Sequence, residues 1–186
     1  MRTPVTEETF HNKKILILDD DRYMAGILRS ILEIFNIGHI SLTASTDEAI
    51  KSLQNRTFDC VFVDNLISAD NGMNLVEYVR KSQDDQKRKI PIILCTAFTG
   101  LRSILTARDT GVTEVLAKPI SPEQVMSKLG NALFNPRPFI FCDVYTGPDR
   151  RRRINRDGDV KEKRRTEEVI LEDTEKPPLP PQETTP

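Results

Sequence analysis

The stretch 61-VFVDNLISADNG-72 joins a continuous apolar run to a carboxylate, Asp64, and reaches Gly72 eight residues later. A short apolar run without polar interruption is typical of a strand covered on both faces of a parallel sheet. A carboxylate directly after such a run stands at the carboxyl end of the strand, where open parallel sheets bind their ligands. This stretch therefore bears on both the fold and the functional site.

Four further apolar runs recur along the chain, at residues 15–18, 39–42, 90–94 and 112–116. The segments between them carry apolar residues at three-to-four-residue spacing, which is typical of amphipathic helices. This alternation of strand and helix through residues 12–135 predicts an α/β domain. The expected architecture is (βα)5, a doubly wound parallel five-stranded sheet with right-handed crossovers and helices on both faces.

The length and composition fit one ordinary domain rather than two. The 186 residues include 27 basic and 28 acidic side chains, for a net charge of −1. No apolar run approaches the roughly 20 residues of a membrane span, and residues 1–11, expected to be flexible, lack the apolar core of a signal peptide. The cysteines have no metal-binding spacing, so we expect a reduced, cytoplasmic protein.

The composition changes after residue 135. Residues 136–186 contain few apolar side chains, with a basic block at 150–165 and an acidic, proline-rich stretch at 166–186. Such a segment buries too little apolar surface to offset the entropy of ordering it, so most of this tail is expected to be disordered. Three aromatic side chains of the tail are candidates for docking on the domain or on a partner: Phe139, Phe141 and Tyr145.

Polar side chains end four of the five apolar runs. Asp19 and Asp20 follow the first run and Asp64 follows the third, while Thr96 and Lys118 follow the fourth and fifth. Because the carboxyl ends of parallel strands share one edge of the sheet, we expect these groups to meet there. Neighbouring carboxylates repel one another and stay ionised when they share a hard cation, a role that suits Mg²⁺.

These groups together suit phosphoryl transfer. Asp64, beside a metal ion, is a carboxylate nucleophile able to accept a phosphoryl group. Thr96 is expected to hydrogen bond one phosphoryl oxygen and Lys118 to pair with another, so that the site acts mainly by electrostatic positioning. A single aspartate after a strand is usually a cap or turn residue. The joint occurrence of these groups at four strand ends favours a functional site.

The chain from about residue 12 to 135 resembles the receiver domain of bacterial two-component response regulators, the CheY-like family. Four pieces carry the resemblance: ILILDDD at 15–21, FDCVFVD at 58–64 followed by Gly72, IPIILCTA at 90–97, and AKPIS at 117–121. In addition, YTGPDRR at 145–151 resembles a short appendage found after some proteobacterial single-domain receivers. The resemblance implies a flavodoxin-like receiver fold with strand order 2-1-3-4-5.

The resemblance also implies a role for each site residue. Asp64 is the implied phospho-acceptor, and Thr96 and Lys118 are the implied sensors of the phosphoryl group. The implied Mg²⁺ site consists of carboxylates and one backbone carbonyl: Asp19, Asp20, Asp64 and Leu66. Such a protein takes phosphate from a histidine kinase or phosphotransfer protein and signals to a downstream protein, with no enzymatic activity beyond its own phosphorylation and dephosphorylation.

Three departures from the family pattern involve four positions. Val115 stands where an aromatic residue is usual, so the ring that normally responds to movement of Thr96 is missing. Ser68 replaces a typical proline in the loop after the phospho-acceptor. Leu66 and Phe98 are apolar at positions whose side chains help to admit or orient the hydrolytic water. Slow self-dephosphorylation is therefore expected.

Three alternatives stay open at the level of sequence. The chain is a receiver-like adaptor that is never phosphorylated, or a nucleic-acid-binding regulator that uses the arginines of residues 150–165. Nearby acidic residues dilute that basic field and make nucleic-acid binding the weaker reading. The third alternative is a haloacid-dehalogenase-type phosphatase built on Asp19 and Asp21, although Tyr23 does not fit its motif. Phosphorylation of Asp64 or of Asp19 discriminates between the receiver and the phosphatase.

Overall fold

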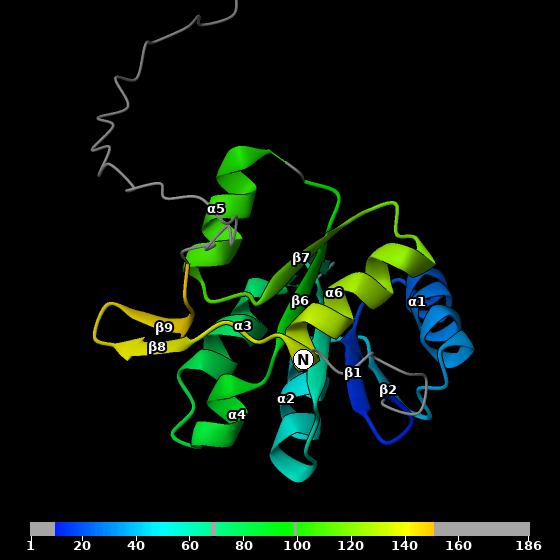
Figure 1. Ribbon diagram of the computed structural model, residues 1–186, viewed down its shortest axis with the longest axis horizontal. Coiled ribbons are helices and arrows are strands. Elements are labelled where there is room, and N and C mark those ends of the chain that lie inside the picture. The colour runs from blue at the N-terminus through cyan, green and yellow to red at the C-terminus, as the bar shows by residue number, and fades with distance from the viewer. Residues whose placement is uncertain (1–9, 68–69, 99, 151–186) are drawn as a thin grey trace, which may run out of the picture. The chain divides into compact units, whose positions relative to one another are not determined.

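The apolar runs form the strands of one parallel sheet in the computed structural model, which describes residues 10–67, 70–98 and 100–150 (Figure 1). The strand order is β2-β1-β3-β6-β7, which confirms the expected order 2-1-3-4-5 when only the strands of this sheet are counted. All four pairings between neighbouring strands are parallel. The five strands are β1 (Lys14–Leu18), β2 (His39–Thr43), β3 (Cys60–Asp64), β6 (Ile92–Thr96) and β7 (Glu114–Ala117).

Helices cover both faces of the sheet and create two apolar cores (Figure 1). Helices α1 (Arg22–Ile34) and α6 (Pro122–Phe134) pack on one face. Helices α2 (Thr46–Asn55), α3 (Met73–Arg80) and α5 (Leu101–Asp109) pack on the other. Alternate residues of β3 enter the two cores, so every residue of that strand is buried. This double coverage explains why the run lacks the polar alternation of a half-exposed strand.

Local signals in the sequence set where several helices begin. The Ser45 hydroxyl accepts a hydrogen bond from the Glu48 amide at the start of α2. Ser121 accepts from the Gln124 amide in the same way, and Pro122 occupies the first turn of α6. These caps satisfy amide groups that have no partner within the helix.

Two short elements were not expected from the sequence. The loop after Asp64 forms a small antiparallel pair, β4 (Leu66–Ile67) with β5 (Asp70–Asn71). Helix α4 (Asp85–Lys89) precedes β6, and the Asp84 carboxylate caps it by accepting from two amides. Neither element has the apolar periodicity that identifies a helix or strand in a sequence.

The first part of the tail, of which most was expected to be disordered, has defined structure. Residues beyond α6 form an antiparallel hairpin of β8 (Phe139–Cys142) and β9 (Tyr145–Pro148) (Figure 1). Tyr145 is only 7% exposed, and its hydroxyl donates to the Pro148 carbonyl at 2.6 Å. Residues 151–186, including most of the basic block and all of the acidic stretch, lie outside the described residues.

Arginine side chains hold this hairpin on the domain through aromatic rings. Arg88 lies 4.1 Å from the centroid of the Phe141 ring, and Arg150 lies 4.4 Å from that of Tyr145. Arg80 lies 5.6 Å from the Phe139 ring centroid. Contacts of this kind stabilise a segment without an apolar core of its own, which is why composition underestimated its order.

Arg80 is the buried centre of this junction. Its guanidinium donates to the carbonyls of Gly111, Arg88 and Ile90, at 2.9, 2.7 and 2.9 Å. Burial lowers the pKa of Arg80 to about 10, which leaves the group charged at neutral pH. Gly111 passes close by with a left-handed backbone (φ +98°), and a Cβ there would lie 2.6 Å from the Thr146 carbonyl oxygen. The end of α3, the start of β7 and the hairpin are therefore joined.

None of the helices among the described residues has both the length and the apolar character needed to cross a bilayer.

Candidate functional site

The ends of four strands bring the predicted site residues to one edge of the sheet. Asp64 is the last residue of β3 and Thr96 the last residue of β6, and Asp19 and Lys118 directly follow β1 and β7. The parallel register aligns Asp64 with Cys95 and Thr96 with Ala117. The expected convergence of these groups at the carboxyl edge is thus observed.

Three carboxylates form a compact cluster. Asp19, Asp20 and Asp64 offer oxygen atoms that all lie within 4.8 Å of one another. Asp19 and Asp64 are both 7% exposed, so their charges are poorly screened by water. Hard oxygen donors at this spacing fit Mg²⁺, which takes carboxylate ligands and retains several waters. Leu66 begins β4 two residues after Asp64, and its carbonyl as a further ligand stays a prediction.

Lys118 balances part of this negative charge. Its Nζ lies 2.9 Å from Asp64 Oδ1 and 3.7 Å from Asp19 Oδ2. Burial favours the neutral amine, but the hydrogen bond to Asp64 and the charges of both carboxylates outweigh it, so the pKa of Lys118 is raised. For Asp19 the opposite balance holds, because burial raises its pKa by more than Lys118 lowers it. The cluster therefore favours an additional cation.

Thr96 lies at the same edge of the sheet, at the end of β6. It is buried, and its hydroxyl oxygen accepts a hydrogen bond from the Phe98 amide at 3.0 Å. The Thr96 carbonyl accepts from the Lys118 amide at 2.8 Å, so the backbone links the two residues directly.

A cleft of about 260 Å³ lies beside Thr96, between the sheet and α5. Val115 lines the cleft together with Leu94, Ile104 and Ala107. This is the position at which an aromatic side chain was expected from the family pattern. With valine in its place, the space beside Thr96 is left unfilled.

Two backbone features around Asp64 explain residues that the motif contains. A Cβ at Gly72 would lie 1.9 Å from the Asp64 carbonyl oxygen, so glycine is required there by the close approach of the two chains. The Asn65 amide donates to the Cys95 carbonyl at 2.9 Å and fixes the start of the loop. The sequence identifies Gly72 by its spacing from Asp64, whereas this close contact is visible only in the structure.

Asp21, the third aspartate of the DDD motif, caps a helix and does not belong to the carboxylate cluster. The Asp21 carboxylate accepts hydrogen bonds from the amides of Tyr23 and Met24 and caps α1. The Asp21 amide in turn donates to Asp19 Oδ1 at 2.9 Å, which orients that carboxylate. Asp21 therefore caps α1 and positions Asp19.

Two apolar side chains stand exposed at this edge. Leu66, two residues after Asp64, is 60% exposed, and Phe98, two residues after Thr96, is 50% exposed. Neither side chain offers a polar atom that would hold a water molecule for hydrolysis. Their placement agrees with the expectation of slow dephosphorylation, which stays a prediction.

The comparison with known families agrees with this geometry. Residues 15–130 match the response regulator receiver domain, and the chain belongs to that family. Among solved structures it is similar to a two-component response regulator from Clostridium difficile, with 29% identity, a TM-score of 0.59, and coverage of 66% of this chain and 96% of the other. It is also similar to the chemotaxis protein CheY4 of Vibrio cholerae, with 25% identity, a TM-score of 0.60, and coverage of 65% and 98%.

Curated relatives are longer proteins. The chain is 28% identical over 118 residues to the "Probable transcriptional regulator ycf27" of Guillardia theta, covering 63% of this chain and 44% of that one. It is 27% identical over 125 residues to the response regulator MprA of a Mycobacterium species, covering 67% and 52%. The chain thus spans about half the length of the curated relatives it matches.

Proposed function

We propose that this protein is a phosphorylation-controlled switch in which Asp64 accepts a phosphoryl group from a sensor histidine kinase or a phosphotransfer protein. The observation that carries the proposal is the cluster of Asp19, Asp20 and Asp64, two of them buried, with Lys118 at 2.9 Å from Asp64. Because phosphotransfer from such a kinase takes place in the cytoplasm, we expect the protein to be located there.

In the proposed reaction an oxygen of the Asp64 carboxylate attacks the phosphorus of a phosphohistidine. The phosphorus–nitrogen bond breaks, and the imidazole leaves with a proton from solvent, which yields an aspartyl phosphate. A Mg²⁺ ion held by Asp19, Asp20, Asp64 and the Leu66 carbonyl would supply charge compensation for the phosphoryl oxygens when bound. Lys118 pairs with one phosphoryl oxygen, and the Thr96 hydroxyl donates a hydrogen bond to another.

Hydrolysis of the aspartyl phosphate resets the switch, and the protein acts on no external substrate. Water attacks the phosphorus, the bond to the Asp64 oxygen breaks, and inorganic phosphate leaves. Because Leu66 and Phe98 do not orient this water, hydrolysis is slow and the signal is long-lived.

The output would reach a downstream protein through α5. This helix borders the cleft beside Thr96, and its other end is held by the hairpin. The Tyr145 hydroxyl lies 3.5 Å from the Arg108 carbonyl, and Arg150 pairs with Asp109 at 3.1 Å. A movement of Thr96 on phosphorylation would therefore alter the helix and the surface around the hairpin. Nucleic-acid binding is less favoured here, since Arg150 is engaged by Asp109 and Tyr145.

The test is intact-mass analysis of the full chain with Mg²⁺ and acetyl phosphate. One added phosphoryl group, absent from Asp64→Ala and present in Asp21→Asn, is the expected result. Labelling of Asp19 would support the phosphatase alternative. A folded protein that binds Mg²⁺ and gains no phosphoryl group would support the unphosphorylated adaptor.

A further inference from the structure

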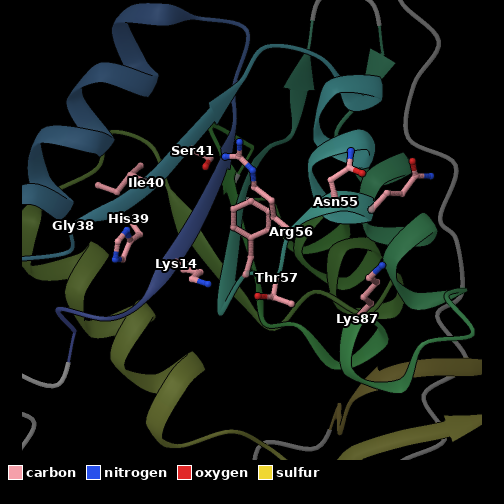
Figure 2. A pocket seen from close by; sticks show the side chains of 11 residues that line it. Lys14, Gly38, His39, Ile40, Ser41, Asn55, Arg56, Thr57 and Lys87 are labelled. Carbon is pink, nitrogen blue, oxygen red and sulfur yellow. The ribbon is translucent and has the colours of Figure 1, made fainter.

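A second hollow lies at the opposite edge of the sheet, where the strands begin (Figure 2). Its volume is about 710 Å³, and it is formed by the starts of β1 and β2, the loop after α2, and α4. We propose that this hollow binds a phosphate-bearing small molecule that also carries a planar ring, a compound of the nucleotide class. The proposal is independent of the phosphoryl chemistry at Asp64.

The charges around the hollow are of one sign. Lys14, Arg56 and Lys87 line it together with His39, and none of the lining residues is an aspartate or glutamate. Figure 2 shows the three cationic side chains arriving from separate elements: β1, the end of α2, and α4. A concave surface with one sign of charge concentrates field lines and raises the local concentration of anions.

The acidic residue next to the lining segment in the chain, Asp59, is already engaged. Asp59 follows the lining residue Phe58 in the chain, pairs with Lys13 at 3.2 Å and accepts a hydrogen bond from the Lys14 amide at 2.8 Å. Within residues 10–67, 70–98 and 100–150, neither Lys14 nor Arg56 has a carboxylate within ion-pair distance. These cations are available to phosphate oxygens, which Arg binds in bidentate geometry and Lys as a point charge.

The neutral lining suits the organic part of such a ligand. Ser41 and Thr57 contribute hydroxyl groups to the wall, and Asn55 contributes a side-chain amide. The Asn55 amide nitrogen donates to the Lys51 carbonyl, which leaves its oxygen as an acceptor facing solvent or ligand. Phe58 supplies apolar surface at the floor. A volume of about 710 Å³ falls within the range of roughly 300–1,000 Å³ that small-molecule sites occupy.

The hollow is a binding site separate from the phosphorylation site at Asp64. The hollow begins at Lys14, the first residue of β1, whereas the phosphorylation edge begins beyond Leu18, the last residue of that strand. Ser41, the lining residue furthest along β2, is in register with Leu16, three residues before Asp19, which corresponds to about 10 Å at roughly 3.3 Å per residue. None of the predicted phosphorylation-site residues lines the hollow.

The experiment is calorimetric titration of the full chain, at physiological salt, with a panel of probes. The probes are ATP, ADP, AMP, GTP, GDP, cyclic AMP and inorganic phosphate. We expect at least one nucleotide to bind, and its affinity to fall at least tenfold in Arg56→Glu and in Lys14→Glu. Lys51→Glu is the matched control, because Lys51 is exposed on α2 but does not line the hollow. The nucleotide affinity of Lys51→Glu should stay within twofold of the affinity of the unaltered protein.

Several results would overturn the proposal. The first is that no nucleotide in the panel binds at millimolar concentration. The second is that the Arg56→Glu and Lys51→Glu variants bind nucleotide with equal affinity. The third is that inorganic phosphate binds as tightly as the nucleotides do. Thermal unfolding of each variant establishes that it is folded before titration. Titration of Asp64→Ala separates the two proposals, since loss of phosphorylation leaves nucleotide binding unchanged.

Discussion

The ammonium group of Lys118 lies 2.9 Å from a carboxylate oxygen of Asp64, and the same group lies 3.7 Å from Asp19. One partly buried cation thus compensates two carboxylates that approach each other at the edge of the sheet. Compensation is incomplete, because Asp20 belongs to the same cluster. Stability and cation binding are consequently linked at this site.

Replacement of Lys118 by Gln tests the link between stability and cation binding. Without the ammonium group the carboxylates repel one another, and we expect a loss of about 1–3 kcal/mol in the free energy of unfolding without Mg²⁺. Added Mg²⁺ should then raise the melting temperature more in Lys118→Gln than in the unaltered protein, because binding to the folded state stabilises it. The control is Lys128→Gln, which removes a surface pair with Glu114 at 2.9 Å. An equal Mg²⁺ response in both variants would contradict the assignment.

Replacement of Leu66 by Asn should accelerate loss of the phosphoryl group. A side-chain amide at this exposed position holds a water molecule near Asp64, and we expect hydrolysis about tenfold faster. The decay of the phosphorylated mass after removal of acetyl phosphate measures the rate. Ile34→Asn, which alters an exposed apolar residue at the end of α1, serves as the control. Rapid decay in the unaltered protein would refute the role of Leu66 and Phe98.

The cleft beside Thr96 should accept a larger side chain at position 115. We expect Val115→Phe to change the free energy of unfolding by less than about 1.5 kcal/mol, since the ring enters existing space of about 260 Å³. Leu116→Phe makes the contrasting change in the tightly packed core, where Leu116 is 1% exposed, and should cost about 1–3 kcal/mol. Urea unfolding of both variants compares the two sites. Equal costs would mean that the cleft does not accommodate the ring.

Two glycine substitutions should have opposite effects. Gly111→Ala forces a side chain into left-handed backbone, 2.6 Å from the Thr146 carbonyl, and we expect it to cost about 1–3 kcal/mol. Gly130→Ala in α6 meets no atom within 4 Å and should stabilise by about 0.5–1 kcal/mol. Proteolysis within residues 139–148 should increase in Gly111→Ala alone. No difference between the variants would mean that the hairpin does not depend on this contact.

The hairpin should weaken at alkaline pH. Burial raises the pKa of the Tyr145 phenol, although nearby cations partly oppose the shift: Arg150, Arg137 and Arg80. The neighbouring Asp109 acts in the same direction as burial. A raised pKa means that the folded state holds the proton more tightly than the unfolded chain, whose phenol titrates near about 10.

The stabilising contribution of Tyr145 is therefore complete below about pH 10 and falls as the pH rises through the folded-state pKa. Urea unfolding between pH 8 and pH 11 should show a steeper loss of stability for the unaltered protein than for Tyr145→Phe. Parallel losses in the two proteins would mean that other groups cause the alkaline decline.

The sheet and the site edge follow from the sequence because their signals are local. Runs such as Cys60–Val63 identify buried strands, and a parallel sheet brings their ends together whatever the details of packing. Asp21 illustrates what such reasoning cannot resolve. Three adjacent aspartates look alike in a sequence. Only the position of the α1 amides shows that Asp21 caps the helix, whereas Asp19 and Asp20 belong to the predicted metal site.

The hairpin was missed for a different physical reason. Its order depends on contacts between distant residues, such as Arg88 with Phe141 and Gly111 with Thr146, rather than on apolar periodicity. Helix α4 was missed because its five residues carry no apolar stripe. For the hairpin, the stabilising partners lie elsewhere in the chain, beyond the window that a pattern samples.

The buried guanidinium of Arg80 has a consequence for where this domain ends. The family match stops at residue 130, yet Phe139 covers Arg80, and Arg137 donates to the carbonyls of Thr113 and Asp149. A chain that ended at Pro136 would lack Phe139, so the guanidinium of Arg80 would be exposed to solvent on the side of that ring. The same guanidinium would still donate hydrogen bonds to the carbonyls of Gly111, Arg88 and Ile90. The contacts that surround Arg80 therefore extend to the hairpin, and a graft or deletion made at the family boundary removes residues that pack against the domain.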